Sequence, residues 1–213
     1  MSRVIAVCRV HELRADAGQV GVTAIDKRPV EGPVKVRRLG LYGDVQADRE
    51  HHGGLEQAVY AYAEESVAEW ARELGRVLPP GIFGENLRTE GLDVDGAELG
   101  ERWRIGTVEF EVSGPRVPCA TFARRMGEPS WVRRFTDRGK VGAYLRVRST
   151  GELRAGDAVE VLSRPGHGVS VSQWFMHQRP EDAQALRDSE REGGLTIGPS
   201  LAAYVDRALA RAH

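Results

Sequence analysis

The chain has 213 residues, with 30 basic and 31 acidic side chains and a formal net charge of −1. This balance excludes the global positive charge that holds nucleic acid or an anionic membrane surface, so neither is expected as a partner. No apolar run approaches the ~18 residues that span a bilayer, and no secretory signal follows Met1, which predicts a cytoplasmic protein. Two cysteines, Cys8 and Cys119, are too few for a disulfide framework or an iron–sulfur cluster.

The first two-thirds of the chain have the pattern of short strands separated by turns. One helix interrupts them, because Val67, Trp70, Ala71 and Leu74 recur at helical spacing and Gly75 follows as a stop. Strands are predicted by β-branched or alternating apolar runs at 4–10, 20–25, 34–39, 57–62, 107–113, 141–147 and 152–162. Many short strands at this spacing predict a β-barrel or a sandwich.

The composition changes at residues 164–168, where proline and glycine predict a linker. Beyond it come three helical patterns and no strand-like run, and the last pattern repeats apolar residues from Leu201 to Leu209. We therefore expect a β-rich body over 1–163 and a small all-α unit over 169–213. At about 45 residues this tail is too small to be stable alone, so it packs on the body or on a second copy in a homodimer.

Cys119 has the most reactive surroundings of any residue in the sequence. It lies between a strand-like segment and a helix-like one, and a thiol at a helix N-terminus faces the positive end of the helix dipole. Arg116 adds a fixed positive charge, and both effects favour the thiolate that attacks electrophiles or binds soft metals. The alternative interpretation of Cys119 is that it is a small, buried hydrophobic residue with no chemical role. Cys8 fits that alternative, because it lies within an apolar strand-like run.

Two polar, glycine-rich segments stand out elsewhere. The first, at 41–54, holds Asp44, Asp48, His51 and His52, which leave three interpretations open: a hard-metal site, a solvated loop, or a turn at Gly53-Gly54. In the last case backbone N–H groups approach an anionic ligand, with His52 as a further donor. The second segment, at 81–87, is predicted to be another loop that approaches a ligand closely.

Several motifs in these segments occur together in one known family. They are Gly43-Asp44, Ala47-Asp48, His52-Gly53-Gly54, Ala58-Val59-Tyr60, Phe83-Gly84-Glu85-Asn86, Arg116-Val117-Pro118-Cys119 and Gly156-Asp157. In this order they resemble the signature of the MOSC-domain family, named after the C-terminal domain of molybdenum cofactor sulfurases. Within it the chain is most similar to the YiiM-like branch, in which a small three-helix domain follows the barrel. The resemblance covers residues 35–163 closely.

The resemblance implies a mainly β fold with α, in which a MOSC β-barrel domain (1–163) precedes a three-helix domain (169–213). It implies a molybdenum cofactor, molybdopterin, whose metal is bound by Cys119. It also implies two-electron reduction of small N-hydroxylated compounds such as hydroxylamino-purines and amidoximes. A separate electron-donor reductase is expected as a partner, because no flavin, nucleotide or iron–sulfur motif is present.

The expected site residues combine this resemblance with residue type. Cys119, His52 and Glu85 form the expected catalytic set, with Glu85 as a proton relay or as the residue that orients a neighbour. The expected cofactor-binding residues are Arg116, Asn86, Gly53, Gly54, Tyr144 and Arg146. Loops far apart in the sequence are expected to meet at Cys119, in one cleft with a net positive potential.

Two other functions use the same residues differently. A sulfur carrier would hold a persulfide on Cys119 for metal–sulfur cofactor assembly, with no bound molybdenum. A non-catalytic binding module, dimeric through its helical tail, would have an inert buried Cys119. A hydrolase with a Cys119–His52 dyad lacks a third orienting residue in the sequence.

Overall fold

The computed structural model describes residues 1–18, 20–46 and 53–211. Its strands are β1 (Arg3–Val10), β2 (Arg14–Ala15), β3 (Val22–Thr23), β4 (Lys27–Pro29), β5 (Val34–Arg37), β6 (Gly40–Leu41), β7 (Val59–Ala63), β8 (Leu87–Glu90), β9 (Arg102–Ile105), β10 (Val108–Pro115), β11 (Ala143–Ser149), β12 (Gly151–Leu153) and β13 (Val159–Ser163). Its helices are α1 (Glu64–Leu74), α2 (Ala120–Met126), α3 (Trp131–Arg138), α4 (Val171–His177), α5 (Pro180–Arg191) and α6 (Pro199–Ala210).

One large mixed sheet organises the body of the protein. Its eight strands follow the order β13-β9-β10-β11-β7-β8-β1-β4, and β7 with β8 is the parallel pair among otherwise antiparallel neighbours. Two smaller sheets, β12-β5-β6 and β2-β3, are separate from the large sheet and make up the rest of the described β structure. This arrangement confirms the prediction of a mainly β fold with α.

The start of β1 meets the start of β13, the strand at one end of the large sheet. Arg3 forms an isolated antiparallel bridge with Ala158, the Val4 amide donates to the Asp157 carbonyl at 2.9 Å, and the Val159 amide donates to Ser2 at 2.9 Å. Over the described ranges no continuous strand ladder joins β1 to β13. The closed barrel that we expected is therefore not shown.

Two strand predictions differ from the structure. The strand expected at 20–25 is reduced to β3, which pairs, among the described strands, with the equally short β2 alone. The single strand expected at 152–162 is divided into β12 and β13 by a turn at 154–157. There the Asp157 carboxylate accepts the Arg154 amide at 2.8 Å, and Gly156 takes a φ of 94° that few other residues adopt.

An aromatic cluster fills the space between β7 and helices α1–α3. Trp70 of α1 and Trp131 of α3 have ring centroids 4.5 Å apart, and Phe122 of α2 meets Phe135 edge-on at 4.9 Å. Tyr62 of β7 joins the cluster through Phe83. Burying each of these rings stabilises the fold by roughly 2–3 kcal/mol. The cluster therefore fixes α2, the helix that begins directly after Cys119.

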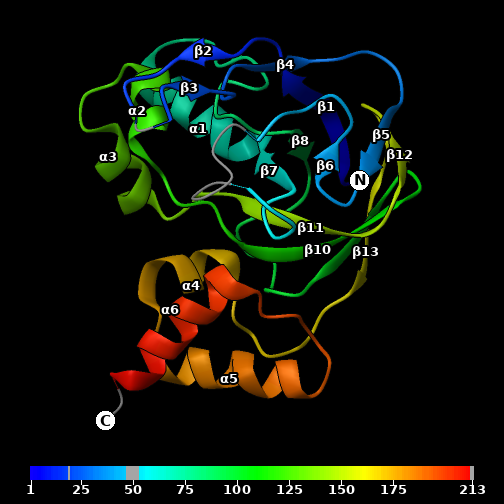
Figure 1. Cartoon of the computed structure of the whole chain (residues 1–213), viewed down its shortest axis with the longest axis vertical. Coiled ribbons are helices and arrows are strands. Elements are labelled where there is room, and N and C mark those ends of the chain that lie inside the picture. Colours follow the sequence, from blue (N-terminus) through cyan, green and yellow to red (C-terminus); the bar gives the residue numbers. More distant parts are fainter. Residues whose placement is uncertain (19, 47–52, 212–213) are drawn as a thin grey trace.

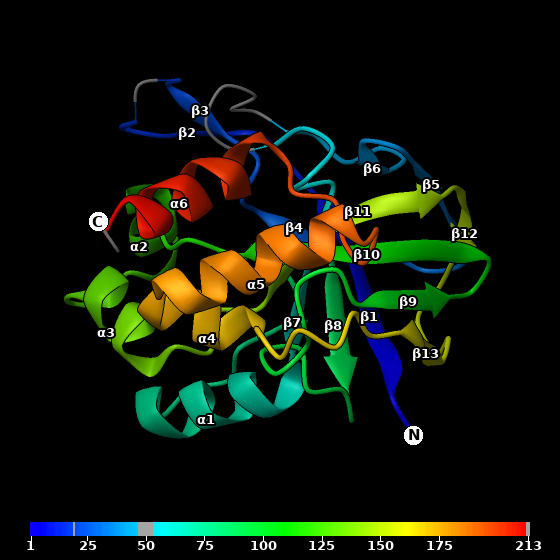
Figure 2. The same ribbon diagram turned by 90° about the horizontal axis from the view of Figure 1, so that it is seen from below.

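Helices α4, α5 and α6 lie together below β10 and β11 (Figures 1 and 2). No strand follows β13 in the described part of the chain, as expected for the tail. Arg146 of β11 ties it to the body by donating to the Thr196 carbonyl at 3.0 Å. The division into two domains stays a prediction. Among the described helices, none has the length and apolar character required to cross a bilayer.

Candidate functional site

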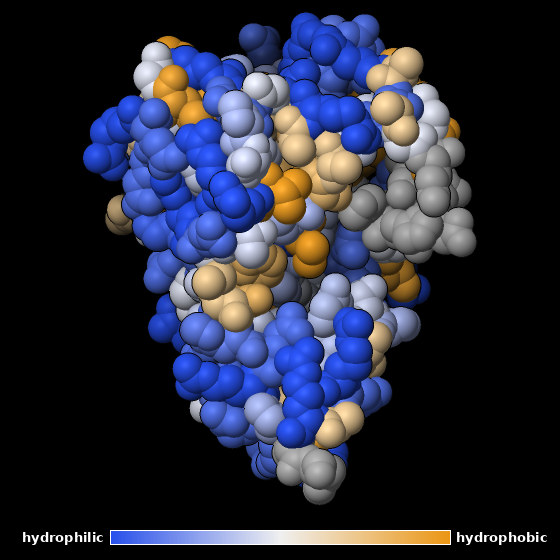
Figure 3. All heavy atoms as spheres, turned by 90° about the vertical axis from the view of Figure 1, so that its left-hand side faces the viewer, coloured by the Kyte–Doolittle hydropathy of each residue, from blue (hydrophilic) through white to orange (hydrophobic). Residues whose placement is uncertain are grey.

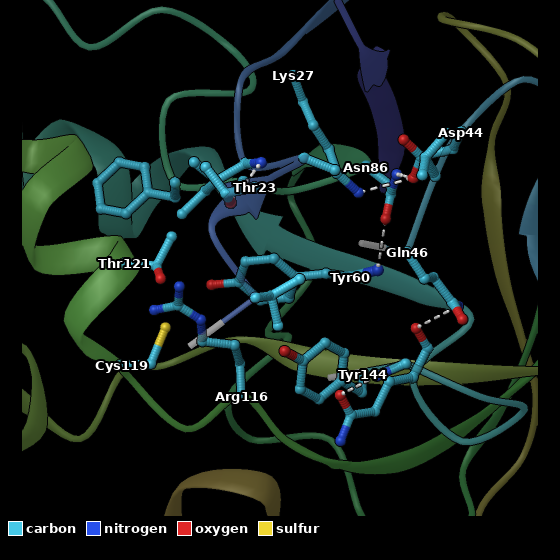
Figure 4. A pocket seen from close by; sticks show the side chains of 18 of the residues that line it. Thr23, Lys27, Asp44, Gln46, Tyr60, Asn86, Arg116, Cys119, Thr121 and Tyr144 are labelled. Carbon is cyan, nitrogen blue, oxygen red and sulfur yellow. Dashed lines mark hydrogen bonds and ion pairs between the residues drawn. The ribbon is translucent and has the colours of Figure 1, made fainter. Parts of the chain in front are cut away.

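A cavity of about 510 Å³ opens where four segments meet. The β2–β3 hairpin, residues 44–46, the 83–86 loop and the start of α2 all contribute to its wall (Figure 4). Its lining includes Asp44, Phe83, Asn86, Arg116 and Cys119. The expected convergence of these loops on Cys119 is thus confirmed for the described residues.

Cys119 is the residue immediately before α2, in an extended conformation with φ −129°. It is partly exposed, and its side chain points into the cavity toward the Arg116 guanidinium (Figure 4). Because α2 has only seven residues, its dipole is short, and the full charge of the Arg116 guanidinium beside the thiol adds to it (Figure 4). Cys8 differs in every respect: burial raises the pKa of its thiol to about 12, which makes it an inert core residue.

Arg116 is a buried cation with an unfilled hydrogen-bonding position. Only 5% of the residue is exposed, and its Cζ lies 3.6 Å from the centroid of the Phe122 ring. Its Nη1 is buried and has no hydrogen-bond partner among the residues that the structure describes. Leaving a buried charged donor unpaired costs more than the ~1–3 kcal/mol of a neutral one. An acceptor bound in the cavity would remove that cost.

Asp44 and Asn86 hold the cavity wall together. Asp44 accepts hydrogen bonds from the Val10 amide at 2.8 Å, from Lys27 Nζ at 2.7 Å and from Asn86 Nδ2 at 2.7 Å. Asn86 Nδ2 also donates to the Cys8 carbonyl, and its Oδ1 accepts the Tyr60 amide. Asn86 therefore has no amide hydrogen left for a cofactor, contrary to expectation.

The hard-metal interpretation of the 41–54 segment finds no support at Asp44, since three donors already surround its carboxylate. No group of three or more metal-ligating side chains occurs within 1–18, 20–46 and 53–211. Asp48, His51 and His52, the last of which we expected to be catalytic, lie outside the described residues.

Gly53 and Gly54 use their backbone N–H groups within the loop. The Gly53 amide donates to Gln57 Oε1 at 3.1 Å, and the Gly54 amide donates to Gln46 Oε1 at 2.9 Å. Gly53 lines the cavity, whereas Gly54 does not. In this structure two glutamine side chains therefore already accept from the backbone N–H groups that we expected to bind an anionic ligand.

Glu85 is fully buried and does not line the cavity. Its carboxylate accepts the Gly81 amide at 2.8 Å, the Phe83 amide at 3.0 Å and Arg88 Nε at 2.8 Å. These bonds shape the loop that carries Asn86 into the wall. Of the two expected roles, the geometry favours orientation of neighbours over proton relay.

Tyr144 and Arg146 share one face of β11, as expected, but their side chains make different contacts. Tyr144 lines the cavity, and burial raises the pKa of its hydroxyl although Arg116 opposes the shift. Arg146 lies outside the lining and forms an ion pair with Glu111 at 2.7 Å. In this structure its contacts hold the helical tail, and its expected cofactor contact stays a prediction.

The described lining residues of the cavity carry no net charge, so the expected positive potential gains no support from them. Among its described lining residues, Lys27 and Arg116 are balanced by Asp16 and Asp44. Asp16 also accepts hydrogen bonds from Arg124 Nε at 2.8 Å, which lowers its pKa to about 2, and from Thr121. Sequence reasoning missed Asp16 and Lys27, because their partners are remote in sequence and no local motif marks them.

The model of the MOSC domain family matches residues 48–160, more than half of the chain. The chain belongs to the MOSC-domain family. This MOSC protein is 36% identical to YflK of Bacillus subtilis (strain 168) over 79% of this chain and 76% of that protein. It is 34% identical to YiiM of Escherichia coli (strain K12) over 67% of this chain and 65% of YiiM.

A solved structure agrees with these relatives. The crystal structure of YiiM from Geobacillus stearothermophilus superposes with a TM-score of 0.78 at 25% identity, over 98% of the MOSC protein and all of that chain. A protein of Gibberella moniliformis (strain M3125 / FGSC 7600) named "Reductase" is 34% identical over 67% of this chain, but only 26% of its own length is covered.

Three features of the cavity of this MOSC protein are compatible with a molybdopterin. A thiol supplies a soft ligand for molybdenum, and Nη1 of Arg116, unpartnered within the described part of the chain, supplies a donor for an anionic group. The volume lies within the ~300–1,000 Å³ typical of small-molecule and cofactor sites. The residues present therefore fit the cofactor with which the family is associated.

Proposed function

We propose that this MOSC-domain protein binds the molybdenum cofactor in the Cys119 cavity and reduces N-hydroxylated compounds, hydroxylamino-purines and amidoximes among them. The observation that carries the proposal is the pair formed by Arg116 and Cys119. A buried guanidinium, whose Nη1 has no hydrogen-bond partner in the described ranges, lines the same cavity as a partly exposed thiol. A ligand that combines an anionic group with a soft metal satisfies both residues.

Cys119 would hold the molybdenum, because a thiolate is a soft ligand that complements the dithiolene of the cofactor. Arg116 would bind an anionic oxygen through Nη1, since Phe122 and the surrounding rings fix its guanidinium plane. Lys27 is held at the wall by Asp44 and adds a second cation. The chain's part is thus to orient the cofactor and to balance its charge.

The bound cofactor supplies two-electron chemistry to the substrate. In the overall reaction an N–OH group takes up two electrons and two protons, its N–O bond breaks, and an amine and water are released. The electrons come from a separate reductase. The Tyr144 hydroxyl is protonated at neutral pH, since burial raises its pKa further above its ordinary value, and it can donate a hydrogen bond to a substrate at the cavity wall.

The test is to produce the protein in a host that makes molybdopterin, with molybdate supplied, and to measure molybdenum and pterin in the purified protein. Both are expected in the wild type and in Cys8→Ser, whose thiol is buried away from the cavity. Both should be lost from Cys119→Ala, together with N-hydroxyl reduction. Equal molybdenum and equal activity in Cys119→Ala would refute the proposal.

A sulfur carrier remains the second candidate, because the partly exposed Cys119 at a cavity mouth also suits persulfide transfer. Incubation with a cysteine desulfurase and cysteine, followed by mass spectrometry, would detect an added sulfur on Cys119. A persulfide that forms in protein lacking molybdenum under the cofactor-competent conditions would favour this function over reduction.

A further inference from the structure

A second cavity, of about 500 Å³, lies between helices α4 and α6 and the ends of the neighbouring strands β10 and β11. Gln57, Val117 and Tyr144 line both this cavity and the Cys119 cavity, so the two spaces share one wall. Figure 3 shows apolar side chains gathered at the hollow between the body and the helices. A molecule bound in the second cavity would therefore lie next to the Cys119 cavity.

The chemistry of the second cavity differs from that of the first. Trp174 and Phe175 of α4 and Tyr204 of α6 give it aromatic surfaces. Its one charged lining residue among those described is Glu56, and its described lining includes no basic side chain. The first cavity contains Lys27 and Arg116.

Glu56 is held in position by the start of α6. Its Oε2 accepts the Ser200 amide at 3.3 Å, and its Oε1 lies 3.9 Å from Arg146 Nη2. The carboxylate is 18% exposed and remains part of the lining. A fixed carboxylate next to aromatic faces repels an anion and accepts hydrogen bonds from the N–H groups of a planar ring.

We propose that the second cavity binds the planar, uncharged part of the N-hydroxylated substrate, with the N–OH group directed past Tyr144 toward the Cys119 cavity. Free purine bases are accepted there and their phosphorylated forms are excluded by Glu56. The C-terminal helices thus determine which substrates are used. This inference rests on the proposed function, because it assigns a location to the substrate of that reaction.

Calorimetric titration with adenine and with AMP tests the inference without any redox step. Adenine, the amine product of a hydroxylamino-purine, is expected to bind, and AMP to bind at least about tenfold more weakly. Tyr204→Ala should weaken adenine binding by about fivefold or more, because an aromatic contact is lost. Tyr204→Phe keeps the ring and should bind adenine as the wild type does.

Tyr42→Ala is the matched control, since Tyr42 is 57% exposed and lines neither cavity. It should leave adenine binding unchanged. In the loaded protein, Tyr204→Ala should raise KM for the hydroxylamino-purine while kcat stays within about twofold. Absence of adenine binding, AMP binding as tight as adenine, or unchanged binding in Tyr204→Ala would each overturn the inference. None of these results would affect the proposed function, which is judged by molybdenum retention and reduction.

One further outcome would support the inference and contradict the proposed function. In it, the wild type binds adenine and Tyr204→Ala does not, but the wild type retains no molybdenum. It would refute the reductase and leave a purine-binding site between the helices and the sheet.

Discussion

The guanidinium of Arg116 stacks on the ring of Phe122, with Cζ 3.6 Å from the ring centroid, and this contact aims the arginine at the cavity that Cys119 lines. Phe122 belongs to α2, the helix that begins after Cys119. One helix therefore positions both the sulfur and the aromatic surface on which the cation rests. The cation–π contact compensates only part of the desolvation of Arg116, because Nη1 stays without a partner among the described residues.

Arg116→Gln should reduce the molybdenum content of the purified protein by about tenfold or more, because a charge-assisted hydrogen bond contributes roughly 1.5–3 kcal/mol. The melting temperature should change little, since the stacking that is lost is offset by removal of a buried, incompletely paired charge. Arg116→Lys should restore the cofactor only in part, because an ammonium lacks the planar fork. Wild-type molybdenum content in Arg116→Gln would exclude this role for the arginine.

The two thiols should differ sharply in reactivity. Cys119 is partly exposed at a cavity mouth, whereas Cys8 is fully buried and its pKa is raised to about 12 by that burial. The native cofactor-free protein is expected to consume one equivalent of a thiol reagent, and a second only after unfolding. Cys119→Ser should consume none in the native state. Rapid modification of two thiols in the folded wild type would contradict the assignment of Cys8 to the core.

The raised pKa of Asp95 predicts that the stability of the protein depends on pH in the acidic range. Burial raises the pKa of this carboxyl from 3.8 to about 6, although the Gly142 amide donates to it at 2.7 Å. The folded state therefore binds more protons than the unfolded state between these values. The contribution of protonated Asp95 to the free energy of unfolding is fully present below about pH 3.8. It is lost as the pH rises through about 6.

In Asp95→Asn this contribution disappears, whereas the acceptor for the Gly142 amide remains. The free energy of unfolding, measured in urea from pH 4 to pH 7, should fall with pH less in the variant than in the wild type. A difference on the order of 2 kcal/mol across this window is expected. Parallel pH profiles for the two proteins would show that Asp95 ionises normally.

Asp16 connects the β2–β3 hairpin to α2 at the mouth of the Cys119 cavity. Its carboxylate accepts hydrogen bonds from Thr121 at 2.9 Å and from Arg124 Nε at 2.8 Å. Asp16→Ala should destabilise the protein by about 1 kcal/mol, because Arg124 is 40% exposed and solvent screens the pair. The opened mouth should speed modification of Cys119 by a thiol reagent.

A double-mutant cycle with Arg124→Ala measures the coupling between the two side chains. Because hydrogen bonding to Arg124 lowers the pKa of Asp16 to about 2, the coupling is present above about pH 4 and is lost as the pH falls toward 2. A coupling energy that does not change over this range would show that the pair has no electrostatic part.

The sequence by itself determined the local features of this protein. The helical spacing from Val67 to Leu74 and the stop at Gly75 identified α1, whose end Gly75 caps in a left-handed conformation. Alternation identified β10 and β11 and the shared face of Tyr144 and Arg146. Such patterns are readable because periodicity depends on neighbours within one element. The motifs from Gly43 to Asp157, in their order, gave the resemblance to the MOSC-domain family.

Only the tertiary structure decided what each polar residue does. Asn86, Glu85 and Arg146 have residue types suited to a cofactor site, yet their hydrogen bonds are directed to Asp44, to Arg88 and to Glu111. A polar side chain binds whichever partner the fold brings within about 3 Å, and most of these partners come from other strands and loops. For the same reason no local pattern could reveal the hydrogen bond from Arg124 to Asp16. Nor could it reveal that Tyr144 lines both cavities.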